Sequence, residues 1–407
     1  MRDATEPAKT ALRQDGSPAE VLWAFLKLGL TSFGGPIAHL GYFREEFVVR
    51  RRWLDEQAFT GLAALCQFLP GPASSQVGFA IGLKRAGFTG ALAAWTGFTL
   101  PSALALVLFA YGAGALGGPT GAGLLHGLKL VAVSIVGQAV WGMARTLCPD
   151  RERAAIALAA ALVVLFSASP AAQIGAIALG AFAGLRLCRH EAGVSSGHLE
   201  IPVPRRTGIW ALAALLLILI GLPVLRDFGH FEGLAFFDAF YRSGALVFGG
   251  GHVVLPLLRE AFVTPGWVSD DAFLAGYGAA QAVPGPLFTF AAYLGAIASP
   301  GPHGLAGAAL GLAGVFLPGM LILTGVLPFW DSFQKRAFAQ AAMRGINAAV
   351  VGLLGAALYN PVWTSSVKTV ADFGIALTCF VLLTVWRLPP LAAVLISAAG
   401  GIVLAHS

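Results

Sequence analysis

Charged residues are scarce in this chain. Asp, Glu, Lys and Arg make up 11% of its 407 residues, against roughly 25% in typical soluble domains. Hydrophobic residues reach 57%, and the mean hydropathy is +0.77. A soluble protein of this length does not bury so much apolar side chain. The composition therefore excludes an ordinary soluble domain and indicates a chain whose helices face lipid and one another.

The sequence motifs of metal, redox and nucleotide chemistry are also missing. The cysteines are scattered, form no Cys-x-x-Cys pair, and stand at Cys66, Cys148, Cys188 and Cys379. There is no His-Glu-x-x-His, no Walker-type phosphate loop and no convincing Ser/His/Asp constellation. We therefore predict that the protein is not an enzyme, holds no metal or cofactor, and is not driven by ATP bound to this chain.

A basic tract and a leader peptide are absent as well. The net charge of +6 is spread along the chain, so the sequence predicts no nucleic-acid partner. The first 20 residues are polar and lack an apolar core, so we expect no signal peptide. Residues 1–20 are instead predicted to form a cytoplasmic tail.

Apolar segments of roughly 20 residues, the length that crosses a bilayer, recur along the rest of the chain. Six of them precede a polar stretch at residues 188–208, one follows it directly, and six more come after. The sequence thus predicts an all-α polytopic membrane protein of about 13 spans. The predicted segments are Val21–Phe43, Gln57–Leu83, Phe88–Leu116, Leu124–Leu147, Ala154–Ala168, Ala171–Leu187, Ile209–Leu225, Leu234–Leu258, Asp271–Ala298, Leu305–Phe329, Phe338–Leu358, Val370–Val385 and Leu388–Ala405.

The positive charges predict how these spans are oriented. With the N-terminus inside, the inner loops and tail hold 16 Lys and Arg residues and the outer loops hold 6. Because Lys and Arg concentrate on the cytoplasmic side, we expect the N-terminus inside and the C-terminus outside. The main exception is residues 44–53, REEFVVRRRW, which this count places outside. Either that loop is truly outside, or the segment before it is re-entrant and the number of crossings differs.

The chain repeats itself about half its length apart. Phe33-Gly34-Gly35 matches Phe248-Gly249-Gly250 at an offset of 215, and QFLPGP at 67–72 matches QAVPGP at 281–286 at an offset of 214. The charges recur in the same order, as the pairs Lys27 and Arg242, Arg44 and Arg259, Glu45 and Glu260, and Lys129 and Arg344. We predict a first half at 21–190, a linker with the extra span at 191–230, and a second half at 231–407.

The extra span inverts the second half relative to the first. Two inverted-topology homologous halves are a common architecture of secondary transporters. Within each half, Gly-Gly and Pro-Gly-Pro interrupt an apolar segment, because glycine is a poor helix former and proline removes a backbone donor. We therefore predict broken or re-entrant helices, with structural breaks at Pro36, Pro70, Pro72, Pro284 and Pro286.

Non-helical backbone inside a membrane must be covered by protein or line a cavity. The N-terminus of a half-helix attracts anions, so four breaks related by a pseudo-twofold axis are expected to surround one small anion. In-span charges mark a path, and glutamine amides are donors to oxygen. The candidate binding residues are Lys27, Gly34, Gly35, Gln67, Gly71, Arg242, Gly249, Gly250, Gln281 and Gly285. Charge or coupling roles are predicted for Arg44, Glu45, Lys129, Arg259, Glu260 and Arg344.

Structural interpretations of the same residues stay open at this point. Lys27 and Arg242 lie near the starts of their spans, where such side chains also snorkel to the interface. Paired glycines also serve close helix–helix contact. His39 and His252 are not at aligned positions, so a structural role is expected for each.

The segments FLKLGLTSFGGPIAHL (25–40) and LPGPASSQVGFAIG (69–82), with their second-half copies, resemble the chromate ion transporter family. Long members of that family are fusions of two homologous halves. The resemblance implies a carrier in the inner membrane that exports chromate, with sulfate as a competitor or counter-substrate. The second half departs from the pattern, because Gly251 stands where the first half has Pro36.

The leading hypothesis is therefore a secondary transporter that exports chromate. Coupling to sulfate or to protons is left open. The alternatives are a carrier of sulfate or another oxyanion, or an anion channel. The expected partners are chromate, sulfate and the lipid bilayer, and a homodimer is compatible with the sequence.

Overall fold

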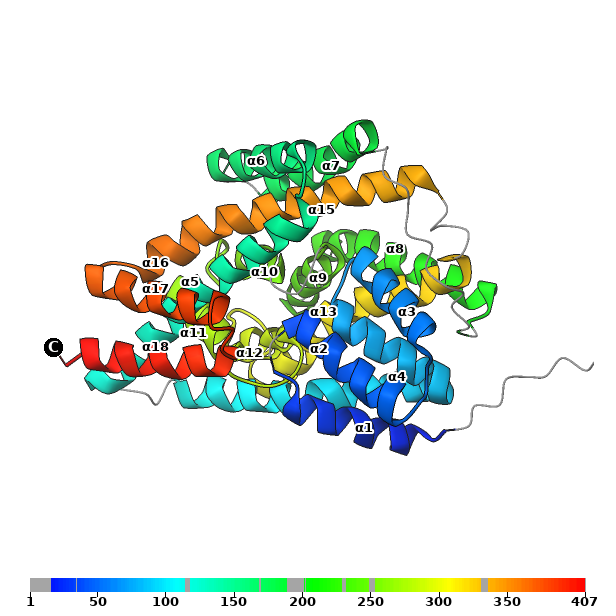
Figure 1. The fold of residues 1–407 in the computed structure, drawn as a ribbon, viewed down its shortest axis with the longest axis horizontal. Coiled ribbons are helices and arrows are strands. Elements are labelled where there is room, and N and C mark those ends of the chain that lie inside the picture. The colour runs from blue at the N-terminus through cyan, green and yellow to red at the C-terminus, as the bar shows by residue number, and fades with distance from the viewer. Residues whose placement is uncertain are drawn as a thin grey trace, which may run out of the picture.

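The structure, a computed structural model, describes residues 16–33, 35–113, 118–167, 170–188, 201, 203–228, 232–248, 253–330 and 336–406. These residues form helices joined by short loops, and they contain no β-strand (Figure 1). The predicted all-α architecture is therefore confirmed. Apolar side chains that face outward from the long helices, such as Trp210 and Leu217 of α8 (Arg205–Phe228), each 74% exposed, fit a protein surrounded by lipid.

Short helices open the first half. They are α1 (Pro18–Thr31), α2 (Gly35–Arg44), a π-helical turn (Glu45–Arg50) and α3 (Glu56–Phe68). Ser17 caps α1 by accepting a hydrogen bond from the Glu20 amide, and Asp55 caps α3 by accepting one from the Ala58 amide. The Phe-Gly-Gly element separates α1 from α2, and the Pro-Gly-Pro element follows α3.

The next helix, α4 (Ala73–Ala113), is a helical hairpin. Its backbone is non-helical at Ala86 and at Gly87, where φ is +65°. A Cβ atom placed on Gly82 would lie 2.3 Å from the carbonyl oxygen of Gly90, so the two arms, 73–85 and 88–113, run in close contact. The small residues at this crossing are what permit such an approach.

Longer helices complete the first half, and the second half repeats the order. The first half ends with α5 (Gly118–Leu147), α6 (Arg151–Phe166) and α7 (Pro170–Leu187), and α8 connects the halves. The second half contains α9 (Glu232–Ala245), α10 (Val254–Phe262), α11 (Asp270–Ala280), η3 (Leu287–Thr289), α12 (Phe290–Ile297), α13 (Gly304–Val326), η4 (Leu327–Phe329), α15 (Ala337–Ala357), η5 (Leu358–Trp363), α16 (Thr364–Ser366), α17 (Val370–Thr384) and α18 (Pro390–Leu404).

Each half packs one long helix against the other half. Helix α5 lies against α17 and α18, where a Cβ atom on Gly127 would be 2.3 Å from the carbonyl oxygen of Ser397. Its repeat counterpart α15 lies against α6 and α7, where Gly345 meets the backbones of Gly180 and Gly184 (Figure 1). The two halves are therefore intertwined rather than side by side.

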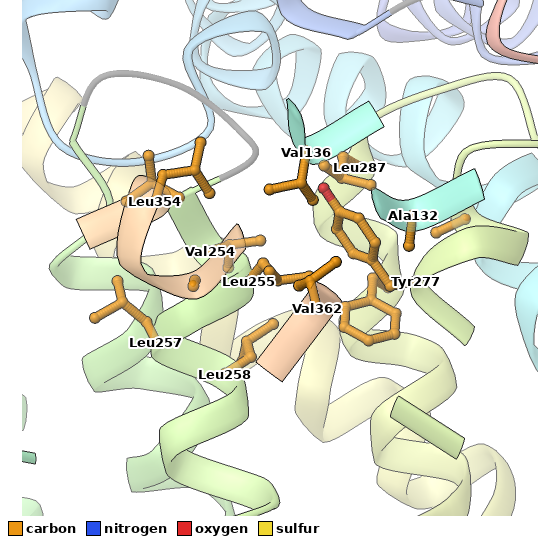
Figure 2. Packing of buried hydrophobic residues seen from close by; sticks show 14 of the residues in the cluster. Ala132, Val136, Val254, Leu255, Leu257, Leu258, Tyr277, Leu287, Leu354 and Val362 are labelled. Carbon is orange, nitrogen blue, oxygen red and sulfur yellow. The ribbon is translucent and has the colours of Figure 1, made fainter. Parts of the chain in front are cut away.

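The largest buried apolar cluster joins helices of both halves. Figure 2 shows Val136 of α5, Val254 of α10, Tyr277 of α11 and Leu354 of α15 gathered in it. A second cluster lies within α1, α3 and α4 of the first half and also includes side chains of α13. Both clusters therefore pack short helices against long ones.

One aromatic contact is repeated in both halves. Phe25 stacks on Phe47 with ring centroids 4.7 Å apart, and their repeat partners Phe240 and Phe262 lie 4.3 Å apart. All four side chains are fully buried. This pair packs the first short helix of each half against the end of the second, so the repeat seen in the sequence is also a structural repeat.

The predicted count of about 13 spans is not confirmed. Among the described residues, five helices are long and apolar enough to cross a membrane, at Ala73–Gly112, Gly118–Leu147, Arg205–Leu225, Gly304–Phe329 and Ala337–Ser366. Four segments predicted as single spans, including Val21–Phe43 and Gln57–Leu83, are each divided by a break. The 14 residues of α1 extend only about 21 Å at 1.5 Å per residue, less than the ~30 Å hydrocarbon core.

In the first half, the start of α1 lies beside the loop that follows the π-helical turn and beside the bend of α4. Near the start of α1, Glu20 lies 3.2 Å from the guanidinium of Arg85 and 3.9 Å from that of Arg51. Both guanidinium groups lie over the ring of Trp53, at 5.0 Å and 5.3 Å. The sequence-based charge count placed Arg51 and Arg85 on opposite sides of the membrane. The structure brings them to one place, which corrects that assignment.

The second half repeats this arrangement. Trp267 is the repeat partner of Trp53, and its ring contacts Phe236 at the start of α9 and Phe262 at the end of α10. Its carbonyl oxygen accepts a hydrogen bond from the amide of Ser299, just after α12. In each half, the two broken segments therefore return to the end of the molecule from which they start. This geometry is the one that the re-entrant alternative requires.

Candidate functional site

The Pro-Gly-Pro break of each half binds to the Phe-Gly-Gly break of the other half. The Gly71 amide donates a 2.7 Å hydrogen bond to the carbonyl of Val247, and the Gly285 amide donates a 2.9 Å hydrogen bond to the carbonyl of Ser32. Gly71 and Gly285 are repeat partners, and so are Ser32 and Val247. We call this meeting point the crossover site; it consists of Ser32, Pro70, Gly71, Pro72, Val247, Pro284, Gly285 and Pro286.

The two glycines of the crossover site meet two demands at once. Gly71 has a φ of +117° and Gly285 a φ of +105°, which L-residues rarely adopt. A Cβ atom on Gly71 would lie 2.9 Å from the Cα atom of Gly319, and one on Gly285 would lie 2.8 Å from the hydroxyl of Ser102. Ser102 and Gly319 are again repeat partners. The contacts between the halves are therefore reciprocal, as a pseudo-twofold relation requires.

The other candidate glycines are described only in part. Gly35 begins α2 with a φ of +79°, so it too needs the left-handed region. Pro36 follows it in the first turn of α2, where a missing amide is tolerated. Gly34, Gly249 and Gly250 lie outside the described residues.

The two predicted glutamines are not equivalent in the structure. Gln67 is exposed on α3, whereas Gln281 is the C-cap residue that follows α11 and lies next to Tyr277. The Gln281 Nε2 atom is buried and has no hydrogen-bond partner among the described residues. Only the second-half glutamine therefore points its amide into the protein.

A glutamine outside the predicted set of binding residues lies beside the crossover site. Gln76 is 1% exposed, and its Nε2 donates hydrogen bonds of 2.9 Å to the carbonyls of Pro70 and Gly319. It therefore fastens the first Pro-Gly-Pro element to α13 of the other half. Its repeat partner is Phe290, so a search for repeated polar residues passes over it. The available signal was an amide side chain inside an apolar helix.

Carboxylates neutralise the two in-span cations near the breaks. Lys27 lies 3.6 Å from Glu46 with its side chain 56% exposed. Arg242 donates to Asp238 at 2.8 Å and to the carbonyl of Leu219 on α8 at 3.1 Å. None of these contacts reaches the crossover site. The structure thus places both cations beside the breaks without joining them to the crossover site.

Arg44 and its repeat partner Arg259 each form an ion pair with an acidic residue of their own half. Arg44 donates to Glu56 at 2.7 Å, and Arg259 donates to Asp270 through two bonds of 2.9 Å and 3.1 Å. The hydrogen bond from Arg44 also lowers the pKa of the Glu56 carboxyl. Each pair ties the second short helix of its half to the third.

Glu45 and Glu260, by contrast, differ between the halves. Glu45 accepts from Arg50 at 3.1 Å. The Glu260 Oε1 atom is buried without a hydrogen-bond partner among the described residues.

The remaining cations tie the intertwined helices to the opposite half. Lys129 on α5 donates to Asp271 on α11 at 2.9 Å. Arg344 on α15 donates to the carbonyl of Cys188, beside the end of α7, at 2.9 Å. The sequence predicted a charge or coupling role for both residues. Their contacts join one half to the other and do not reach the crossover site.

Comparison with known proteins agrees with this two-half organisation. A family model described as Chromate transporter matches residues 19–185 and 234–402. A chromate transport protein of Pseudomonas aeruginosa is 29% identical over 360 residues, which cover 87% of this chain and 83% of that protein. The uncharacterized transporter MJ0718 of Methanocaldococcus jannaschii is 26% identical over 360 residues, covering 87% of both chains.

A third relative, the chromate transport protein of Cupriavidus metallidurans, is 25% identical over 360 residues, covering 83% of this chain and 81% of that protein. No solved structure matches. The two regions of the family match each contain one Phe-Gly-Gly and one Pro-Gly-Pro element, which are the breaks that meet at the crossover site. This chain, a multi-pass membrane protein, therefore belongs to the chromate transporter family.

Proposed function

We propose that this protein is a secondary transporter that exports chromate across the inner membrane and binds the oxyanion at the crossover site. Family membership and the names of the relatives support chromate as the substrate. The proposed location of the oxyanion rests on the pair of reciprocal hydrogen bonds, Gly71 to Val247 and Gly285 to Ser32. Breaks from both halves meet there, and interrupted helices are where carriers of inverted-repeat architecture bind their substrates.

The re-entrant short helices support an inverted arrangement of the halves. On this proposal the first-half pairs enter from the cytoplasm and the second-half pairs enter from the outside. The crossings are then made by the second arm of α4 and by α5, α6, α7, α8, α13, α15, α17 and α18. This odd number places the C-terminus outside when the N-terminus is inside.

The distribution of charge supports the same topology. In this topology the inner side holds 19 Lys and Arg residues and the outer side holds 3. This bias is stronger than the 16 to 6 of the arrangement with about 13 single spans, and it has the sign that membrane proteins favour. The inner residues are Arg2, Lys9, Arg13, Arg44, Arg50, Arg51, Arg52, Lys84, Arg85, Arg145, Arg151, Arg153, Arg186, Arg189, Arg205, Arg206, Lys335, Arg336 and Arg387. The outer residues are Arg226, Arg259 and Lys368.

This topology gives the proposed carrier a physical basis for alternating access. The re-entrant pairs of the two halves approach from opposite faces and touch at the crossover site. A rearrangement that opens one pair to its own face has a counterpart, related by the pseudo-twofold axis, that opens the other pair to the opposite face. An anion held where they touch is then released to either side without a continuous pore.

Transport by the purified full-length protein in proteoliposomes tests the proposal. Proton, potential and sulfate gradients are imposed one at a time while chromate flux is measured. The expected result is saturable chromate flux that sulfate inhibits and that at least one gradient drives. Sulfate flux without chromate flux supports a carrier of another oxyanion instead. An ionic current far above carrier turnover in a planar bilayer supports a channel.

A further inference from the structure

Unpaired buried polar groups gather on the first-half side of the crossover site. Five side chains there, each at most 3% exposed, have a buried polar atom without a hydrogen-bond partner among the described residues. The atoms are Ser32 Oγ, His39 Nε2, Ser75 Oγ, Gln76 Oε1 and Thr99 Oγ1. Buried polar groups are normally satisfied, because leaving them unpaired destabilises the fold. Such a concentration therefore indicates that a ligand or water completes these bonds.

Contacts on the α2 side show that these groups belong to one region. The Nδ1 atom of His39 lies 3.3 Å from the hydroxyl of Ser74, beside Ser75 in the chain. The His39 ring packs against Phe98, with centroids 5.2 Å apart, and lies against the backbone of Ser32. Thr99 follows Phe98 directly in the second arm of α4.

The same region reaches the glycines of both Pro-Gly-Pro elements. Ser32 accepts the hydrogen bond from Gly285, and a Cβ atom on Gly285 would approach the Ser102 hydroxyl, which itself donates to the carbonyl of Thr99. Gln76 lies beside Gly71, because a Cβ atom on Gly71 would be 2.9 Å from its Nε2 atom. Ser32 and Gln76 therefore touch the crossover site directly, and contacts through Ser102, Phe98 and Ser74 link the other three groups to them.

The described residues of the second half offer no such set at the corresponding positions. At the positions that the repeat relates to Ser32, His39, Gln76 and Thr99 stand four apolar residues, Val247, Val254, Phe290 and Phe316, each at most 1% exposed. The fifth partner, Thr289, is polar but satisfied, because its hydroxyl donates to the carbonyl of Pro286 at 2.7 Å. The pseudo-twofold axis thus relates a polar side to an apolar side.

We propose that Ser32, His39, Ser75 and Thr99 form an oxyanion half-site, so that the bound anion lies off the pseudo-twofold axis on the first-half side. The inference rests on the proposed function, and it adds which half recognises the substrate and by what chemistry. Hydroxyls, and the imidazole when its proton is on Nε2, donate hydrogen bonds to the oxygens of a tetrahedral dianion such as chromate or sulfate. The apolar side chains of the second half then cover the anion.

Neutral donors also suit a carrier better than a buried cation does. They stabilise an oxyanion through charge-assisted hydrogen bonds. They do not form a buried ion pair with it, and breaking such a pair would slow the release of the anion. Gln76 is a positioning residue here, because its amide donates to two carbonyls and holds the first Pro-Gly-Pro element against α13. Its Oε1 is left to accept from water or from the hydroxyl of a protonated anion.

Binding of chromate and of sulfate to purified full-length variants tests the half-site. The variants are Ser75→Ala and Thr99→Val, and Thr289→Val in the second half is the matched control. Dissociation constants are measured by calorimetry in oxyanion-free buffer, and unfolding midpoints are measured without ligand. Each first-half variant is expected to weaken binding about tenfold or more, the usual effect of losing a hydrogen bond to a charged group, while Thr289→Val binds like the wild type.

The ligand-free midpoint separates recognition from a structural role. Removing an unpaired buried hydroxyl leaves the ligand-free protein as stable as before or more stable, so Ser75→Ala and Thr99→Val should keep the wild-type midpoint. If the wild-type protein binds and transports an oxyanion and both variants bind it with wild-type affinity, the half-site is wrong but the proposed function stands. Water then occupies the site of the unpaired groups. A wild-type protein that neither binds nor transports any oxyanion overturns the proposed function and the half-site together.

Discussion

Two glycines make the contact between the halves possible. Gly71 and Gly285 each have a positive φ, and at each of them an atom of the opposite half lies within 3 Å of the position that a Cβ atom would take. For any other residue, a backbone conformation of this kind costs about 1–3 kcal/mol, before any steric conflict is counted. The conformational demand is the same in both halves, which explains why both copies of the element have glycine at this position.

We expect Gly71→Ala and Gly285→Ala each to destabilise the folded protein by about 1–3 kcal/mol. The reason is backbone strain together with the clash at Gly319 or Ser102. The measurement is the unfolding midpoint in detergent. Gly112→Ala is the control, because no atom lies within 4 Å of its Cβ position. Wild-type midpoints in both crossover variants would contradict the packing described here.

The sequence predicted the glycines of the crossover site but not the polar side chains beside it. Gly71 and Gly285 recur because both halves need the same turn. Gln76 and His39 do not recur, since their repeat partners are Phe290 and Val254. A search for paired residues finds what symmetry requires and misses what one half does alone. Gln67 shows the converse, because it is repeated at Gln281 yet lies exposed on α3.

At the scale of the helices, the positions of the breaks could be predicted from the sequence. Whether the chain crosses or turns back after each break could not. Hydropathy and Gly/Pro content are the same for a broken span that crosses and for a pair of helices that returns. What decides between them is tertiary contact at the hairpin ends, around Trp53 in the first half and Trp267 in the second. Those contacts join residues far apart in the chain, so local patterns do not reveal them.

Cysteine labelling distinguishes the two topologies. In a background with the four native cysteines replaced by serine, Arg52→Cys should react with a membrane-impermeant maleimide only in inverted vesicles. Thr264→Cys, at the corresponding end of the second half, should react only in intact cells. Both positions are exposed.

Two positions serve as controls for this labelling, because both topologies place them alike. Arg151→Cys is expected inside and His406→Cys outside. The arrangement of about 13 single spans, estimated from segment length, places residue 52 outside and residue 264 inside. Labelling of Arg52→Cys from outside would therefore refute re-entrant hairpins.

At the scale of the whole molecule, the halves defined by sequence are not separate bodies in space. Helix α5 places Gly123, Gly127 and Ser134 against α17 and α18, and the Ser134 hydroxyl donates to the carbonyl of Ala376. Helix α15 makes the corresponding contacts with α6 and α7. The sequence repeat shows which helices correspond but does not show which half each helix packs against. A half on its own therefore leaves these close-packing faces without their partners.

This intertwining leads to a prediction about the halves expressed as separate chains. Residues 1–200 and 201–407 should each accumulate poorly alone, because the small-residue faces of α5 and α15 are then exposed to lipid. Produced together, they should copurify. Gly127→Leu should abolish copurification, since its Cβ position already lies 2.3 Å from the carbonyl oxygen of Ser397.

The control lies on the same helix. Gly142→Leu should leave copurification intact, because nothing lies within 4 Å of its Cβ position. Small residues allow membrane helices to approach closely, and a large side chain in such an interface forces them apart. Loss of the complex in Gly127→Leu alone therefore locates the association at the face of α5 that meets α18. A first half that remains folded and monomeric by itself, with the unfolding midpoint of the two-chain complex, would show that the halves fold independently and that the contacts of α5 with α17 and α18 are dispensable.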